Sequence, residues 1–273
     1  MRECREQGVL TSTTLMANVA AFGPAAELAR QLTAEQRLPR FSVGCHVVLV
    51  DGEPLLPAAQ LSSLVGRGGR FRRALSEFAK AALGNQIRSE EIEQETTAQI
   101  RKLQAAGVEV SHFDTHKHVH MFPSVLKGVL LAAKNCGVTA VRNPFEANFA
   151  MAASVIARPS LWMRYAQVQV LRRWRAGFIK TVREFGMATT DGSLGVTFTG
   201  AMNAELLTTT LRTMPEGSWE LVSHPGYNDT ELQHAGTRLL KSRATELELL
   251  TSPKTRDLLQ RENIELISFR DLR

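Results

Sequence analysis

The strongest chemical signal in the sequence is the run 111–123, where imidazole and carboxylate side chains recur at every second position. Four of the seven histidines in this 273-residue chain fall within nine positions of it. Asp114, His116, His118 and His120 would share one face of an extended strand, because side chains two residues apart point the same way. Such a face is costly unless a divalent metal compensates it, which predicts a metal site; the alternative is a polar edge strand that faces solvent.

Two more histidines and one arginine lie within or directly after other apolar runs. His46 lies inside an apolar run at 41–50, and His224 precedes a Pro-Gly turn. A lone histidine in a strand is commonly a hydrogen-bonded core residue, but the cluster favours a ligand role for His46. Arg142 follows a further short run, and its guanidinium can hold a substrate oxygen, pair with a carboxylate such as Asp114, or lie on the surface.

Together these side chains indicate hydrolysis assisted by a metal. Imidazole nitrogens with a carboxylate suit zinc and other transition metals, whereas Mg²⁺ prefers more oxygen ligands. A bound ion lowers the pKa of its water and polarises a carbonyl group. A metal-dependent phosphoesterase is an alternative, although that chemistry generally uses more carboxylates than we can place near the cluster.

The elements that must position these residues alternate between strands and helices from end to end. Apolar or β-branched runs predict strands at 8–16, 41–50, 108–120, 138–146, 219–227 and 264–268, and a loop with a short strand at 191–200. Helical spacing and end signals predict helices at 24–36, 89–106, 123–136, 203–211, 239–250 and 253–262. Residues 55–88 read as irregular. The alternation predicts an α/β fold with a parallel sheet, barrel-like in form, in which the strand ends that carry the histidines also carry the active site.

Composition limits the function classes. The chain is 44% hydrophobic and has no apolar run of the roughly 18 residues that a membrane span needs. Its charged first residues lack the apolar core of a signal peptide, and Cys4, Cys45 and Cys136 are isolated, which favours the reducing cytoplasm. The net charge of +6 favours an anionic partner only modestly, and the lack of a nucleic-acid-binding motif argues against nucleic acid as a partner. We therefore expect a single domain over residues 1–273.

One segment, at about 147–187, is rich in arginine and tryptophan among apolar residues. It reads as a basic amphipathic helix or helix pair, inserted in the domain or capping it. Such a segment can rest on a membrane surface, contact a partner subunit, as in a homodimer, or cover a substrate. The sequence leaves these three alternatives open.

At this point the chain resembles a known family. The runs that carry the resemblance are Gly-Val-Leu-Thr-Ser-Thr-Thr-Leu-Met at 8–16, Val-Gly-Cys-His-Val-Val-Leu at 43–49, Phe-Asp-Thr-His-Lys-His-Val-His-Met-Phe-Pro at 113–123 and Ser-His-Pro-Gly at 223–226. They resemble the YdjC family, which includes chitooligosaccharide deacetylases and hopanoid-biosynthesis-associated deacetylases. The run 141–146 and the basic segment are more similar to the second branch.

The resemblance implies a barrel-like fold related to polysaccharide deacetylases, a divalent metal (Mg²⁺ or Zn²⁺), and removal of N-acetyl groups from amino sugars or oligosaccharides. By motif, His46 and His116 would bind the metal, and His224 would act as the general acid. Asp114, His118, His120 and Arg142 would then face the substrate or support the ligands; their numbers are those of this sequence.

One departure from the family pattern bears on activity. Family members open with a strand that ends in Asp-Asp-Phe-Gly and supplies a metal-associated aspartate. That motif would precede Met1, and residues 1–7 read as the tail of a helix. We therefore expect a late start or a truncation, with the first strand and part of the first helix missing and activity impaired. A non-catalytic sugar-binding or scaffold remnant of the same fold is the corresponding alternative.

Overall fold

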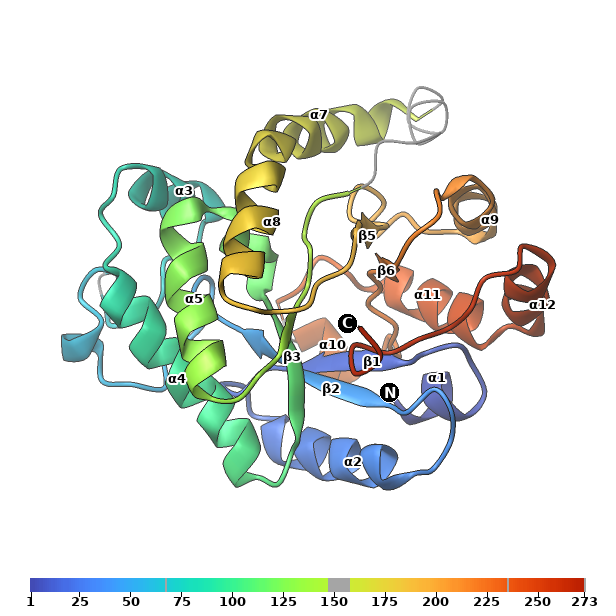
Figure 1. The fold of residues 1–273 in the computed structure, drawn as a ribbon, viewed down its shortest axis with the longest axis horizontal. Helices are drawn as coiled ribbons and strands as arrows, with labels where there is room; N and C mark the ends of the chain where they lie inside the picture. The colour runs from blue at the N-terminus through green and yellow to red at the C-terminus, as the bar shows by residue number, and fades with distance from the viewer. Residues whose placement is uncertain (67, 147–157, 235, 273) are drawn as a thin grey trace. The chain divides into compact units, whose positions relative to one another are not determined.

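A computed structural model of the protein describes residues 1–66, 68–146, 158–234 and 236–272 (Figure 1). The chain divides into two compact units, each of which contains one parallel sheet. The four-stranded unit comprises Ser12–Pro144, Arg173–Thr189 and Ser268–Arg273. The two-stranded unit comprises Met1–Thr11, Phe145–Arg172 and Thr190–Ile267.

The sheet of the four-stranded unit has the order β1-β2-β3-β4, and all its strands run parallel. The strands are β1 (Ser12–Leu15), β2 (Ser42–Val47), β3 (Val110–Thr115) and β4 (Ala140–Val141). Every residue of β2 except His46 is buried, as expected for a parallel strand that reads as an apolar run. Parallel pairing brings the carboxyl ends of β2 and β3 together, and these ends carry the predicted site.

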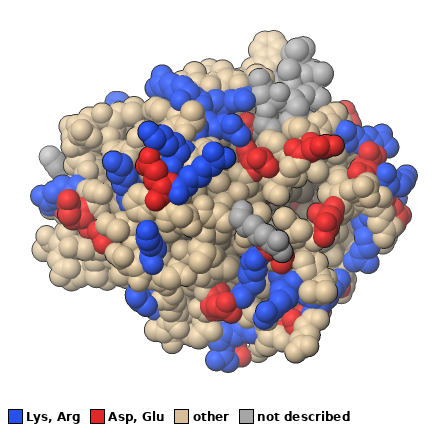
Figure 2. Space-filling model, viewed as in Figure 1, with Lys and Arg blue, Asp and Glu red and all other residues tan. Residues whose placement is uncertain are grey.

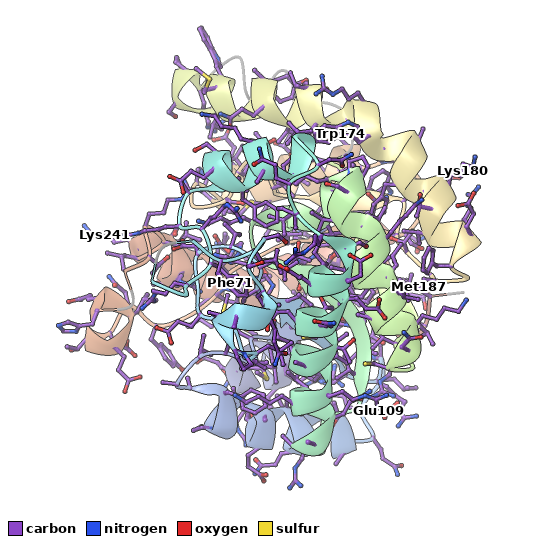
Figure 3. The ribbon with its side chains drawn as sticks, turned by 90° about the vertical axis from the view of Figure 1, so that its left-hand side faces the viewer. Phe71, Glu109, Trp174, Lys180, Met187 and Lys241 are labelled. Atoms are coloured by element: carbon purple, nitrogen blue, oxygen red, sulfur yellow. The ribbon has the colours of Figure 1, made fainter. Side chains whose placement is uncertain are left out.

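Helices complete the described part of this unit: α2 (Phe22–Ala34), α3 (Leu75–Leu83), α4 (Ser89–Ala105), α5 (Pro123–Asn135) and α8 (Arg175–Glu184), with the 3-10 turns η1 (Ala58–Gln60) and η2 (His116–Met121). Helices α4 and α5 pack side by side, and Lys180 of α8 points away from them (Figure 3). Gly128 permits the close approach, because a Cβ atom there would lie 2.9 Å from Cγ2 of Ile92.

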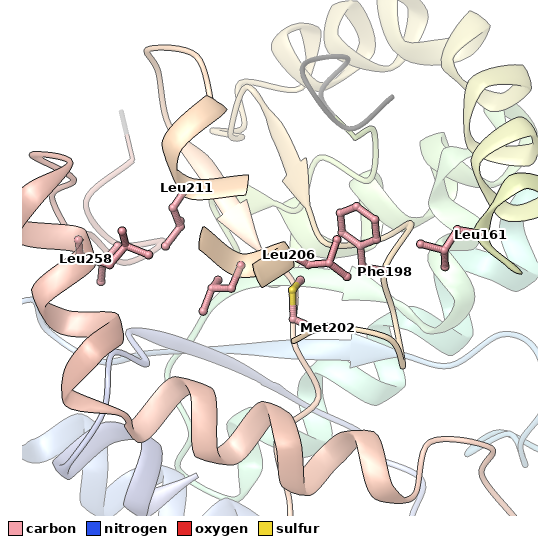
Figure 4. Packing of buried hydrophobic residues seen from close by; sticks show 8 residues of the cluster. Leu161, Phe198, Met202, Leu206, Leu211 and Leu258 are labelled. Carbon is pink, nitrogen blue, oxygen red and sulfur yellow. The ribbon is translucent and has the colours of Figure 1, made fainter. Parts of the chain in front are cut away.

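The two-stranded unit is built around a parallel pair, β5 (Gly192–Leu194) and β6 (Trp219–Leu221). Its described helices are α1 (Arg2–Glu6), α7 (Trp162–Leu171), α9 (Ala204–Thr213), α10 (Thr230–His234), α11 (Lys241–Thr251) and α12 (Pro253–Arg261), with the 3-10 turns η3 (Pro159–Leu161) and η4 (Arg172–Trp174), the latter at the unit's edge. A core of leucines with Phe198 and Met202 joins α9 to α12 (Figure 4). Asn203 caps α9, as predicted, because its side chain accepts the N–H of Leu206 at 2.9 Å.

Two predictions of local structure are wrong. Residues 55–88, expected to be irregular, contain helix α3, whose Phe78, Ala81 and Ala82 are buried. The predicted last strand, 264–268, has no regular secondary structure and pairs with no strand of the described chain. Its first N–H instead closes helix α12 by donating to the carbonyl of Leu259 at 2.8 Å.

The prediction of one domain with a basic insertion or cap at 147–187 stays a prediction. Residues 147–157 of that segment lie outside the described residues, and most of the rest forms α7 and α8. On the face drawn in Figure 2, basic side chains gather over α8. Among the described residues, no helix is long and apolar enough to cross a membrane. Contact with a membrane surface or with a second copy of the chain likewise stays a prediction.

Candidate active site

The centre of the candidate site is a contact between neighbouring strands. His46 of β2 is paired in register with Asp114 of β3, so the two side chains lie next to each other on one face of the sheet. Nδ1 of His46 lies 2.8 Å from Oδ1 of Asp114. Because an ionised carboxylate can only accept, Nδ1 carries the proton and Nε2 keeps a lone pair. This is the tautomer that a metal-binding histidine requires when Nε2 is the ligand.

A partly buried arginine binds the same carboxylate from its other side. Arg142, which follows β4, forms an ion pair with Oδ2 of Asp114. Burial opposes ionisation of Asp114, but Arg142 and then His46 outweigh burial and hold its pKa well below the usual value. The sequence left three roles open for Arg142, and the one seen in the structure is the ion pair with Asp114.

The histidine cluster is not one face of a strand, and that prediction is wrong. Strand β3 ends at Thr115, and residues 116–121 form the turn η2. Lys117 and His118 have φ angles of 56° and 55°, in the left-handed region that non-glycine residues seldom adopt. The turn therefore breaks the two-residue alternation and points His116, His118 and His120 in different directions.

His116 is the cluster histidine that meets His46. Its Nδ1 lies 3.4 Å from Nε2 of His46, with the two rings at 72°. Burial, and next the nearby His46, lower the pKa of His116 to about 4, so its ring is neutral near pH 7. Two imidazoles whose nitrogens face one another in this way can serve as a pair of metal ligands.

The spacing of this pair fits a metal ion. Two nitrogens on a tetrahedral ion, each about 2.0–2.1 Å from it, are themselves separated by about 3.3–3.4 Å, and the nitrogens of His46 and His116 lie 3.4 Å apart. Within the described part of the chain, no group of three or more histidine, cysteine or carboxylate side chains is placed to hold a metal. His46 and His116 therefore have the spacing to bind one metal ion with two protein ligands.

His120 supports the site from within the core. Its Nε2 donates to the backbone carbonyl of Arg142 at 3.0 Å, and its Nδ1 lies 2.7 Å from the hydroxyl of Thr115. The same hydroxyl accepts the backbone N–H of His120 at 3.1 Å. Burial lowers the pKa of His120 to about 4. His120 thus ties the end of β3 to the backbone that carries Arg142.

His118 occupies a different position. Burial, and next the charge of Arg142, lower its pKa well below the usual value. Its Nδ1 is buried and has no hydrogen-bond partner among the described residues. The ring lies beside His120, with centroids 6.5 Å apart. No hydrogen bond within the described part of the chain links His118 to the proposed metal ligands, so the structure does not assign it a supporting role. A role of His118 in binding substrate stays a prediction.

The sequence analysis missed two residues that shape this site. Gln99 of α4 holds the backbone of Val48, two residues after His46, by accepting its N–H and donating to its carbonyl, both at 2.8 Å. Lys117 donates to Asp51 at 2.7 Å and so joins η2 to the loop after β2. A signal for Gln99 did exist, because it recurs with two glutamates at four-residue intervals on the buried side of α4.

His224 belongs to the two-stranded unit, and its surroundings are described there alone. It follows β6, after Val222, whose N–H donates to the carbonyl of Leu194 at 2.9 Å. Its backbone N–H donates to Glu246 of α11. The position at the carboxyl end of a parallel strand agrees with the sequence prediction.

Two proteins are similar in sequence to the chain over nearly its whole length. A protein named carbohydrate deacetylase from Brevibacillus brevis is 29% identical over 271 residues, which cover 99% of this chain and 91% of that protein. A protein named carbohydrate deacetylase 1 from Listeria innocua is 30% identical with the same coverage. Both matches therefore span the part of the chain from His46 to His224.

A solved structure and a family profile complete the comparison. The crystal structure of a protein from Enterococcus faecalis, titled a cellobiose-phosphate cleavage protein, matches with a TM-score of 0.74 and 24% identity over 98% of this chain and 90% of that one. This likeness confirms the predicted fold class. The profile of YdjC-like proteins matches residues 1–261. With the family motifs and these relatives in agreement, the chain belongs to the YdjC-like protein family.

Proposed function

We propose that this protein is a carbohydrate deacetylase, a hydrolase that removes N-acetyl groups from amino sugars or oligosaccharides with the help of a divalent metal. The observation that carries the proposal is the pair of facing nitrogens of His46 and His116, 3.4 Å apart, with Asp114 fixing the tautomer of His46. The names of the relatives supply the substrate class and the reaction.

In this proposal the chain's own residues divide the work. A bound divalent ion would polarise the acetamide carbonyl and lower the pKa of water. His46 and His116 would hold that ion, and Asp114, anchored by Arg142, would keep the proton of His46 on Nδ1. His224 would donate a proton to the nitrogen of the departing amine, since an amine anion is too poor a leaving group to depart without one.

The ligand chemistry bears on which ion is used. Both proposed ligands are imidazole nitrogens, which suit zinc, whereas Mg²⁺ favours oxygen ligands. We therefore expect zinc to support activity better than magnesium. A cytoplasmic location agrees with this proposal but remains a prediction.

Two alternatives are less well supported. A phosphoesterase would use more carboxylates than Asp114, whose two oxygens are already engaged by His46 and Arg142. A non-catalytic sugar-binding protein would give no reason for a carboxylate that fixes the tautomer of a histidine.

The direct test is release of acetate from N-acetylglucosamine oligosaccharides. The purified protein is stripped with a chelator, and Zn²⁺ or Mg²⁺ is then added in separate reactions. We expect no release from the stripped protein and recovery with zinc. Sugar binding without acetate release under any metal condition would support the non-catalytic alternative, and turnover of a phosphoester in place of the amide would support the phosphoesterase.

A further inference from the structure

The turn that carries His224 is attached to helix α11 by a buried carboxylate. Glu246 is 3% exposed, and its Oε2 accepts the backbone N–H of His224. The backbone N–H of Gly200, in the segment after β5, contributes a second hydrogen bond to this carboxylate. Burial raises the pKa of Glu246, while these N–H groups and Arg243 oppose the rise. One side chain thus joins the segments that follow both strands of the two-stranded sheet.

Arg243, one turn earlier on the same helix, holds the other side of the turn. Its carbonyl accepts the N–H of Gly226 at 3.1 Å, and its Nη1 lies 3.5 Å from the carbonyl oxygen of His224. Its Nε donates to the carbonyl of Leu239 at 3.1 Å, which fixes the guanidinium. The peptide of His224 is therefore held at its N–H and near its carbonyl by two residues three positions apart.

This attachment is more than the turn alone needs. The turn contains Pro225, whose ring already restricts the backbone. A buried carboxylate costs free energy unless several donors compensate it, and a smaller neutral side chain could cap one N–H at lower cost. The two donors that Glu246 gathers both belong to segments at the carboxyl end of the sheet, where orientation matters for chemistry.

We propose that Glu246, assisted by Arg243, is a positioning residue that sets the backbone of His224 so that its imidazole can donate a proton to the leaving amine. The inference rests on the role of His224 in the proposed function. Glu246 itself does not touch the reacting atoms in this proposal; it acts through the peptide of His224.

The test compares two leaving groups. Cleavage of an N-acetylglucosamine oligosaccharide needs a proton on the departing nitrogen, whereas 4-nitrophenyl acetate releases a stable phenolate without one. We expect His224→Gln to lower kcat for the amide by roughly 10²- to 10⁴-fold, the usual contribution of a general acid. We expect Glu246→Gln to lower it in the same direction by about tenfold, since glutamine keeps one acceptor but loses the charge. Neither change should alter KM, and both variants should cleave the ester close to the wild-type rate.

Two further variants separate positioning from folding. Glu246→Leu removes the acceptor altogether, so its amide kcat should fall further than that of Glu246→Gln. Glu248→Gln, an exposed position on the same helix, is the matched control and should leave both activities unchanged. Equal losses of amide and ester cleavage in Glu246→Gln would overturn the inference, because they would report general damage to the fold.

A measurement that needs no turnover separates this inference from the proposed function. The imidazole resonances of His224 are assigned by NMR through their loss in His224→Gln. They should shift in Glu246→Gln and stay in place in Glu248→Gln. Unchanged His224 resonances in Glu246→Gln would refute the positioning role even if the protein is an active deacetylase. If His224→Gln leaves amide cleavage intact, the proton-donor role and this inference fail together, while metal-dependent deacetylation stands.

Discussion

His46 and His224 are each held by an acidic residue, but in opposite ways. Asp114 forms a hydrogen bond with Nδ1 of the His46 ring and so fixes which ring nitrogen carries the proton. Glu246 accepts the backbone N–H of His224. This contact fixes the position of the His224 backbone and does not determine which ring nitrogen is protonated. The acid beside His46 is ionised by its partners, whereas burial raises the pKa of the acid beside His224.

The difference matches what the two roles require. A metal ligand must keep one lone pair in one direction, so its ring needs a fixed tautomer. A proton donor must be protonated before the reaction and deprotonated after it, so its residue must be placed where the ring can reach the departing nitrogen. The contact of Asp114 with the ring is therefore the kind that a ligand role for His46 requires. The contact of Glu246 with the backbone is the kind that the positioning proposed for His224 requires.

The largest expected effect comes from removing a ring that binds the metal. His46→Ala and His116→Ala should each weaken zinc binding by more than the roughly 10- to 100-fold that loss of a supporting partner costs. Metal content after dialysis, with a competition titration against a chelator, measures this. His234→Ala, an exposed histidine on α10, is the control and should retain the wild-type zinc content. If both His46→Ala and His116→Ala bound zinc with wild-type affinity, neither histidine would be a metal ligand, and the contrast between His46 and His224 would fail.

The next effect tests whether Asp114 acts through the ring. Asp114→Asn should weaken zinc binding by about 10- to 100-fold. It should also destabilise the fold by about 3–5 kcal/mol, because it removes the carboxylate charge that pairs with the largely buried guanidinium of Arg142. Adding Arg142→Met to Asp114→Asn should recover much of the stability, measured by urea denaturation, but none of the zinc affinity. Recovery of both quantities together would mean that Asp114 serves the fold alone.

A smaller effect is expected at the threonine behind the site. Thr115→Val removes the hydroxyl that contacts both Nδ1 and the backbone N–H of His120. Two buried polar groups then lose their partner, which should lower the free energy of unfolding by about 1–3 kcal/mol. Thr245→Val, at an exposed position of α11, controls for the change of side chain. Equal stability of the two variants would show that His120 finds another partner.

Much of the site could be predicted from the sequence because strand ends follow from apolar runs. The runs around His46 and Asp114 led to adjacent parallel strands, and parallel pairing places their ends at one edge. The identity of His116 as the partner of His46 came from the family motif, not from the spacing. The spacing argument by itself assigned four side chains to one face, of which only Asp114 lies on a strand.

What could not be predicted depends on contacts between residues far apart in the chain. The left-handed conformation of Lys117 accompanies its contact with Asp51, 66 positions earlier. Gln99 and Val48 are 51 positions apart, and Glu246 and His224 are 22 apart. Nothing local marks these partners, because any of several polar side chains on a helix could serve. The run 264–268 shows the converse, because residues with strand propensity form no strand there when no neighbouring strand pairs with them.

The smallest expected effect concerns His112, the cluster histidine that takes no part in the proposed chemistry. Its ring is buried, stacked on Phe269 with centroids 3.8 Å apart, and a Cβ atom on Gly44 would lie 2.7 Å from it. Burial lowers its pKa to about 3. In the unfolded chain the ring would titrate near its ordinary pKa of 6.5, so acid favours unfolding and stability falls as the pH drops below that value.

Between about pH 7 and about pH 5.5, this single histidine should therefore lower the free energy of unfolding by about 1 kcal/mol. His112→Phe keeps an aromatic ring against Phe269 but cannot bind a proton, so its stability should fall by that much less over the same interval. Urea denaturation at both pH values measures the difference, and the other buried histidines cancel because both proteins contain them. Parallel pH profiles would mean that His112 takes up a proton as readily in the folded protein as in the unfolded chain, and the effect of burial on the rings of this cluster would then need to be reconsidered.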